Sequence, residues 1–206
     1  ILTSADLVNW RLVNYALPNI PEPGYEIPRH ACGVWAPAIR WHDGFFYIYY
    51  GMPDEGIYMV RAADACGQWD APKLVRAGKG LIDPCPFWDD DGRAYVIHAY
   101  ANSRIGFKSR IGIFPMSADG THAIGEDKFL FDGTANHPTI EGPKVYKRDG
   151  WYYIFAPAGG VATGWQTVLR SRRIDGEYED RIVLRQGNSR VNGPHPVSYT
   201  HLTLPT

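Results

Sequence analysis

Three stretches of the sequence align on an Asp-Gly pair: residues 35–48 (WAPAIRWHDGFFYI), 83–96 (DPCPFWDDDGRAYV) and 141–154 (EGPKVYKRDGWYYI). Each stretch has an apolar residue five positions before the glycine and a tyrosine three positions after it. An Asp-Gly pair between two apolar runs is a strong signal for a β-hairpin, because both residues tolerate the positive φ angles of a tight turn. The sequence therefore predicts three equivalent hairpins.

A second repeated feature is an aspartate that follows each hairpin and also occurs near the start of the chain. The four aspartates are 58, 55 and 56 residues apart: Asp6, Asp64, Asp119 and Asp175. A unit of about 55 residues therefore recurs, and it is long enough for two hairpins, or four strands. No segment shows the pattern of an amphipathic helix. Four-stranded units that repeat around an axis form a β-propeller, whereas a β-sandwich, the alternative, would not require this period.

Composition limits the possible functions. The 206 residues include 21 basic and 22 acidic side chains, a net charge of −1, and 45% of them are hydrophobic. This content supports a folded core, and the balanced charge argues against nucleic acid or a membrane surface as partner. The longest apolar run, residues 45–50, is too short to cross a bilayer. The three cysteines form neither a zinc site nor a disulfide framework: Cys32, Cys66 and Cys85.

The chain holds about 3.7 units of this length, so we expect it to be part of a longer protein. It opens with Ile1 and has no signal-peptide pattern. Asp6 has no inner strand before it, whereas the other units begin 29 to 36 residues before their aspartate. A further unit is expected to start near residues 191–195. Residues 196–206 continue no part of the pattern, and we expect them to be a non-native tail.

One position of the repeat changes its chemistry from unit to unit. Trp35, Asp83 and Glu141 each lie nine residues before the aligned glycine. Since the innermost strand of each blade lines the central channel, these three side chains should converge at one mouth of it. Taken singly, each residue also has a purely structural explanation. For Trp35 it is packing, and for Asp83 it is the extended geometry favoured before Pro84. Glu141 lies in an apolar strand context, where a charge is costly unless it is used or paired.

The loops on the same side of the predicted disc are long, as loops that carry function often are. They span residues 18–34, 99–110, 132–139 and 156–165. Each of their polar and aromatic residues could equally pack within its loop. The residues that they offer around the channel mouth are His30, Asn102, Arg104, Phe107, His137 and Trp165.

Two carboxylates beside a tryptophan suggest glycoside hydrolysis. In that reaction one carboxylic acid protonates the leaving oxygen, and a second carboxylate activates water or attacks. Glu141 is the better candidate for the acid, because Ile140 precedes it and Asp83 offers a nearby like charge that favours the protonated form.

The motifs Trp35-Ala-Pro, Ile82-Asp83-Pro, Asp89-Asp-Asp-Gly92 and Glu141-Gly-Pro, in this order, resemble glycoside hydrolase family 43. The opening Ser4-Ala-Asp-Leu-Val-Asn-Trp10 also resembles it, and the likeness covers residues 1 to about 195. That family consists of five-bladed β-propellers: inverting β-xylosidases, α-L-arabinofuranosidases and arabinanases. The resemblance implies that residues 1–195 are an incomplete five-bladed catalytic propeller. It further implies an enzyme that removes terminal β-xylosyl or α-L-arabinofuranosyl residues from plant oligosaccharides or polysaccharides.

The resemblance also implies roles for residues. Glu141 is the general acid, Asp83 the carboxylate that tunes and orients it, and Trp35 a wall of the sugar pocket. His195 resembles a channel-facing histidine beside a bound ion or water, so a structural calcium ion or water is expected there, with no cofactor required. The candidate substrate contacts from the loops are His30, Phe107 and Trp165.

The sequence departs from the family at the general base, which is an aspartate on the inner strand of the first blade. No aspartate here matches that motif, so we assign no base and expect residues 1–206 alone to be inactive. A retaining invertase-like hydrolase is one alternative, although Ile82 before Asp83 and Gly142 after Glu141 disagree with its motifs. A carbohydrate- or protein-binding propeller without catalysis is another. The choice between xylose and arabinose stays open.

Overall fold

The structure, a computed structural model, describes residues 1–188 and contains three four-stranded antiparallel sheets. In each sheet the strands follow one another in chain order. The first sheet has β3 (Trp35–His42), β4 (Phe45–Met52), β5 (Gly56–Ala62) and β6 (Lys73–Ala77). The second has β7 (Leu81–Trp88), β8 (Ala94–Tyr100), β9 (Arg110–Met116) and β10 (Lys128–Asp132). The third has β11 (Lys144–Arg148), β12 (Trp151–Ala158), β13 (Trp165–Ser171) and β14 (Glu179–Arg185).

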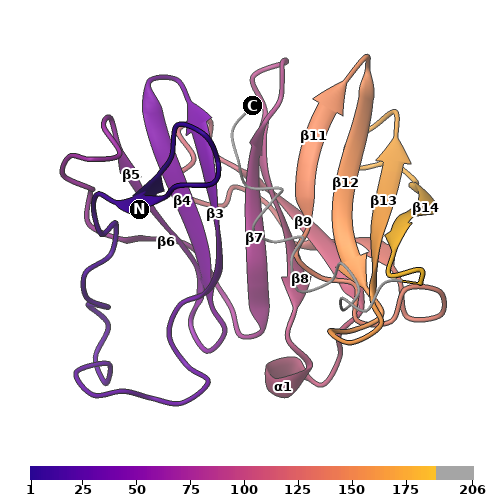
Figure 1. Ribbon diagram of the computed structural model, residues 1–206, viewed down its shortest axis with the longest axis horizontal. Coiled ribbons are helices and arrows are strands. Elements are labelled where there is room, and N and C mark those ends of the chain that lie inside the picture. The colour runs from indigo at the N-terminus through magenta and orange to yellow at the C-terminus, as the bar shows by residue number, and fades with distance from the viewer. Residues whose placement is uncertain (189–206) are drawn as a thin grey trace.

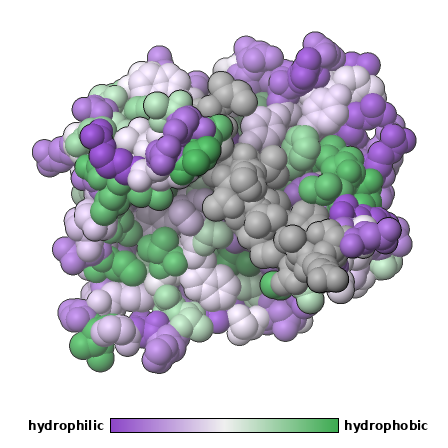
Figure 2. Space-filling model, in the orientation of Figure 1, coloured by the Kyte–Doolittle hydropathy of each residue, from purple (hydrophilic) through white to green (hydrophobic). Residues whose placement is uncertain are grey.

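The sheets are arranged like the blades of a propeller, as the repeat predicted (Figure 1). In Figure 1, β7 lies between β3 and β11 in the middle of the view. The first strands of the three units are therefore neighbours, and the later strands lie farther out. In the space-filling view, hydrophilic residues gather along the rim and apolar patches lie over the first and third sheets (Figure 2).

The Asp-Gly pairs form the predicted hairpins. Asp43 and Gly44 have φ angles of 42° and 82°, and Asp149 and Gly150 have φ angles of 51° and 72°. Positive φ at both central residues is the requirement of the tight type I′ turn. The middle hairpin is wider: the N–H of Asp89 donates to the carbonyl of Arg93, 2.8 Å away.

The repeated aspartates lie in the turns between the third and fourth strands of each sheet. In two of these turns the carboxylate accepts a hydrogen bond from a backbone N–H just ahead: Asp64 from Cys66 at 2.9 Å and Asp119 from Thr121 at 3.2 Å. Asp6 does the same for Val8 at 2.9 Å, between the short strands β1 (Leu2–Thr3) and β2 (Arg11–Leu12). The β1–β2 pair therefore corresponds to the third and fourth strands of a unit. Aspartate recurs because it closes this turn.

The cores lie between neighbouring sheets, where apolar side chains of adjacent units interlock. One core combines residues of the second and third sheets, with Ile97, Ile111, Ile154 and Leu169 fully buried. Another joins the first sheet to the second through Tyr49, Ile57, Val96 and Phe114. This burial is the main force that holds the inner strands side by side.

The part of the chain that the structure describes contains one helix, the single turn α1 (Asn102–Ile105) in the loop between β8 and β9. No helix within residues 1–188 is long and apolar enough to cross a membrane. The expected domain end at residue 195, the expected tail and His195 lie outside the described residues.

Candidate active site at the starts of the inner strands

The first and second sheets meet at the level of Trp35. Trp35 pairs with Gly51 across β3 and β4. A Cβ atom on Gly51 would lie 2.9 Å from the carbonyl oxygen of Leu81 and 3.1 Å from the Cα of Ile82. The two backbones therefore touch at this point, and glycine is required because a side chain has no room. The contact sets Trp35 level with the residues that lead into Asp83.

Asp83 is buried, with 3% of its surface exposed, and lies at an irregularity of β7 between Ile82 and Cys85. Its φ angle is +54°, so it does not take the extended geometry that a residue before proline favours. Its Oδ2 accepts a hydrogen bond from the backbone N–H of Gly142 at 2.9 Å. A strained backbone at a buried carboxylate is typical of a functional position. The Asp83 carboxylate thus lies against the residue that follows Glu141.

Glu141 is partly exposed and lies in the segment that leads into β11. The expectation that it belongs to a strand is wrong, since β11 begins only at Lys144. The physical reason is that Gly142 has a φ angle of +59° and Pro143 has no N–H to donate to a neighbouring strand. The backbone N–H of Glu141 donates to the carbonyl of Pro157 at 3.1 Å, which ties it to the end of β12.

Trp35 is held by an arginine from the helical turn α1. The Arg104 guanidinium lies 5.3 Å from the centre of the Trp35 ring. It also binds Asp54 through two hydrogen bonds of 3.1 and 3.2 Å and donates to the carbonyl of Ala31. The hydrogen bond from Arg104 lowers the pKa of Asp54. Sequence reasoning missed Asp54, because an aspartate after a proline in a short turn has an ordinary structural explanation.

A cationic cluster lies on the inner strands next to Asp83. Lys144 is fully buried, and burial lowers its pKa, while the negative charge of Asp83 opposes that shift. Arg40 of β3 donates to the sulfur of Cys85 at 3.1 Å. One sequence feature points to this cluster: Lys144 follows directly on the Glu-Gly-Pro motif and begins β11.

The other candidate residues predicted from the loops lie at different places in the fold. The indole N–H of Trp165 donates to Nδ1 of His137 at 3.2 Å, so its polar edge is directed into the protein. The ring of Phe107 lies 5.1 Å from that of Tyr100 and 5.7 Å from that of Phe129 on the outermost strand β10. His30 is exposed. Trp35, Asp83 and Glu141 thus lie at the same ends of the inner strands. Phe107 instead packs toward the outer edge of its sheet.

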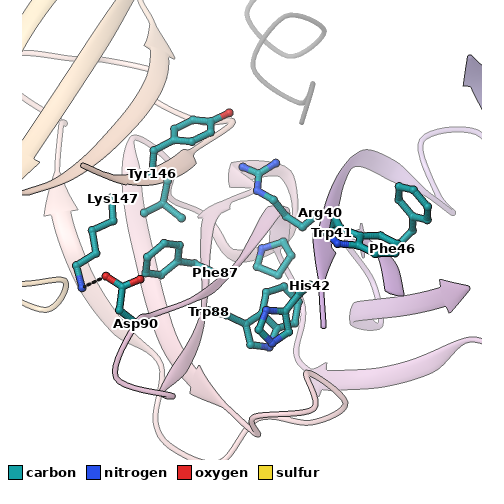
Figure 3. Close-up of a pocket in the computed structure, with 11 residues that line it drawn as sticks. Arg40, Trp41, His42, Phe46, Phe87, Trp88, Asp90, Tyr146 and Lys147 are labelled. Carbon is teal, nitrogen blue, oxygen red and sulfur yellow. Dashed lines mark ion pairs between the residues drawn. The ribbon is translucent and has the colours of Figure 1, made fainter. Parts of the chain in front are cut away.

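A cavity lies at the opposite ends of the same strands. It has a volume of about 710 Å³ and is lined by the later residues of β3, β7 and β11, including Arg40, Trp88 and Tyr146 (Figure 3). His42 stacks on Trp88 there with ring centres 4.4 Å apart, and Lys147 pairs with Asp90 at 3.0 Å. Among the described residues that line the cavity, Asp90 is the single carboxylate, and it is engaged by Lys147. We therefore place the candidate site at the strand starts rather than in this cavity.

Within residues 1–188, no group of three or more histidine, cysteine, aspartate or glutamate side chains could hold a metal ion. The expected calcium ion or water beside His195 concerns a residue outside the described part, so it stays a prediction.

Comparison with known proteins identifies the family. The profile named "Glycosyl hydrolases family 43" matches residues 1–200. A Xylanibacter ruminicola protein named "Putative beta-xylosidase" is 47% identical over 196 residues, which are 95% of this chain and 36% of that protein. A xylan 1,3-β-xylosidase of a Vibrio species is 32% identical over 85% of this chain and 35% of its own length.

Solved structures agree. A crystal structure of xylan β-1,4-xylosidase from Bacillus halodurans C-125 superimposes with a TM-score of 0.72 at 29% identity, covering 87% of this chain and 36% of that one. The chain therefore spans about a third of the length of the relatives it matches. By its sequence profile, its relatives and its fold, the chain belongs to glycosyl hydrolases family 43.

Proposed function

We propose that the protein to which this chain belongs is a glycoside hydrolase that removes terminal pentosyl residues, β-xylosyl or α-L-arabinofuranosyl, from plant polysaccharide. The observation that carries the proposal is the 2.9 Å hydrogen bond from the Gly142 N–H to the Asp83 carboxylate. It fixes a buried aspartate beside a partly exposed glutamate, close to the level of an aromatic side chain. Glycosidic bond cleavage uses a carboxylic acid that protonates the leaving oxygen, and Glu141 is our candidate for that acid.

Glu141 is the proposed general acid. In an inverting hydrolysis, the bond between the anomeric carbon and the leaving oxygen breaks as Glu141 gives its proton to that oxygen. A water molecule attacks the anomeric carbon from the opposite face, and a base takes the proton of that water. Asp83 would orient the acid through the Gly142 peptide, whose N–H donates to its carboxylate.

The general base is proposed to come from an inner strand outside this chain. An inverting pair is roughly 6.5–9.5 Å apart, which leaves room for the water between them. Asp83 is bonded to Gly142, the neighbour of the proposed acid, so we do not assign it as the base. We further propose a five-bladed propeller, in which the three sheets are complete blades and β1 and β2 are the outer strands of another.

Trp35 is proposed as the wall of the sugar pocket. Its ring is clamped on one side by Arg104, which is itself fixed by Asp54, so the wall is rigid. Rigid side chains lower the entropy lost when a ligand binds. Pentosyl substrates are supported by the names of the relatives, which include a xylan 1,3-β-xylosidase and a non-reducing end α-L-arabinofuranosidase of Bacteroides ovatus.

The test is a chimera in which residues 1–188 replace the aligned segment of the Xylanibacter ruminicola relative, assayed beside the unmodified relative. The substrates are an aryl β-xyloside and an aryl α-L-arabinofuranoside, and proton NMR identifies the anomer released first. We expect hydrolysis with inversion, so that the β-xyloside first gives α-xylose. Release of β-xylose would contradict the inverting mechanism. If the relative is active and the chimera is not, this chain does not supply the acid half of the site.

A further inference from the structure

The segment 137–142, which ends in Glu141 and Gly142, is bonded at almost every residue to a different part of the fold. Pro138 accepts from the N–H of Gly159 at 2.7 Å, and the N–H of Thr139 donates to the hydroxyl of Ser109 at 2.8 Å. Glu141 and Gly142 are bonded to the end of β12 and to β7, as described above. We call residues 137–142 the strap. Its hydrogen bonds fix the backbone from which the Glu141 side chain projects.

His137 is the first residue of the strap, and its side chain is 3% exposed. Its Nε2 lies 2.8 Å from Oδ2 of Asp180 on β14. Its Nδ1 lies 3.2 Å from the indole nitrogen of Trp165 and 3.2 Å from the hydroxyl of Thr167, both on β13. One imidazole thus joins the strap to the two outer strands of the third sheet.

These contacts determine where the imidazole carries its proton. The indole N–H of tryptophan can only donate, so Nδ1 of His137 must be the acceptor. The proton is then on Nε2, where it is donated to the Asp180 carboxylate. This tautomer satisfies both ring nitrogens, and its alternative would set two N–H groups against each other.

We propose that His137, fixed as its Nε2–H tautomer by Trp165, Thr167 and Asp180, is a positioning residue for Glu141. It does not touch the reacting atoms. Through the strap it sets the position at which the carboxyl group of Glu141 stands beside Asp83. Positioning of this kind matters because a displacement of about 1 Å can cost about 10²-fold in rate. The effect of His137 on catalysis rests on the proposed role of Glu141 as the acid. The effect of His137 on the position of the strap does not.

The first experiment uses residues 1–206 and NMR. Nitrogen–proton correlation of the imidazole should show His137 protonated at Nε2, and a proton at Nδ1 would overturn the proposal. Amide hydrogen exchange is then compared for His137→Ala, His137→Gln and the control His122→Ala, an exposed histidine in the turn between β9 and β10. Gln is the conservative variant, because its side-chain N–H₂ group can still donate to Asp180.

We expect His137→Ala to speed exchange at Glu141 and Gly142 by about tenfold or more, with Val96 and Ile97 in β8 unchanged. His137→Gln should restore much of the protection, and His122→Ala should have no effect. Equal acceleration in the strap and in β8 would show a merely structural role and overturn the proposal. Unchanged exchange in the strap would overturn it as well.

The second experiment places the same variants in the chimera. His137→Ala should lower kcat by about 10- to 100-fold with little change in KM, because the acid is misplaced while the sugar pocket remains. Recovery with His137→Gln supports positioning, and a change confined to KM contradicts it. If the chimera with native His137 is inactive, the proposed function fails, and the exchange experiment still decides whether His137 fixes the strap.

Discussion

The Asp83 carboxylate accepts the backbone N–H of Gly142 at 2.9 Å, across the boundary between the second and third sheets. The two residues are 59 positions apart and belong to the same part of the repeat in successive units. A single hydrogen bond therefore joins the starts of two inner strands and sets one carboxylate beside the other. The candidate acid and its neighbour are fixed by the same contact that aligns the sheets.

Replacing Asp83 should separate its hydrogen-bonding role from its charge. Asp83→Asn keeps an acceptor and tolerates the positive φ, so we expect a change in unfolding free energy below about 1 kcal/mol. Asp83→Ala removes the acceptor of the Gly142 N–H and places an alanine at a positive φ angle. It should lower the unfolding free energy by about 1–3 kcal/mol. Urea unfolding measures both, with Asp90→Ala as a surface control. Equal stability of the Asn and Ala variants would contradict this role for the bond.

The contact between the first two sheets should be sensitive to a single methyl group. Gly51→Ala sets a Cβ 2.9 Å from the carbonyl oxygen of Leu81, a backbone atom that cannot easily move. We expect a loss of about 1–3 kcal/mol in unfolding free energy, the usual range for overpacking. Gly67→Ala is the control, since its Cβ would meet only its own turn at 3.3 Å. Identical losses for both variants would show that the two backbones do not meet here.

The pair of Asp54 and Arg104 should make part of the stability depend on acid pH. Arg104 holds the pKa of Asp54 below its ordinary value of 3.8, so the folded state favours the carboxylate. A lowered pKa adds stability that is complete above the ordinary value and is lost as the pH falls through the lowered one. The Tm difference between the native chain and Asp54→Asn should thus be full near about pH 6 and shrink below about pH 4. A difference that is constant over this range would exclude the coupling.

Short-range chemistry explains what the sequence predicted about the fold. Asp43-Gly44 and Asp149-Gly150 can adopt the positive φ angles of a tight hairpin, and their spacing revealed the four-stranded unit. The equivalent positions of Trp35, Asp83 and Glu141 followed from the same alignment. Such features depend on a few neighbouring residues, so they can be recognised without a structure.

The features that the sequence did not predict depend on contacts between distant residues. The positive φ of Asp83 requires the partner at Gly142, and the packing of Phe107 requires Phe129 on β10. The clamp on Trp35 needs Arg104 and Asp54, which are 50 positions apart. No local pattern distinguishes such residues from ordinary loop residues, because the fold alone brings them together.

The central claim is that Glu141 gives a proton to the leaving oxygen, and the most direct test is the dependence of the Glu141→Gln chimera on its leaving group. The rates are compared on a xylobiose-type substrate, whose leaving group is poor, and on an activated aryl xyloside. We expect a loss of about 10²–10⁴-fold on the poor leaving group and a far smaller loss on the aryl xyloside, which departs without an acid. Equal losses on both substrates, or none on either, would contradict the account.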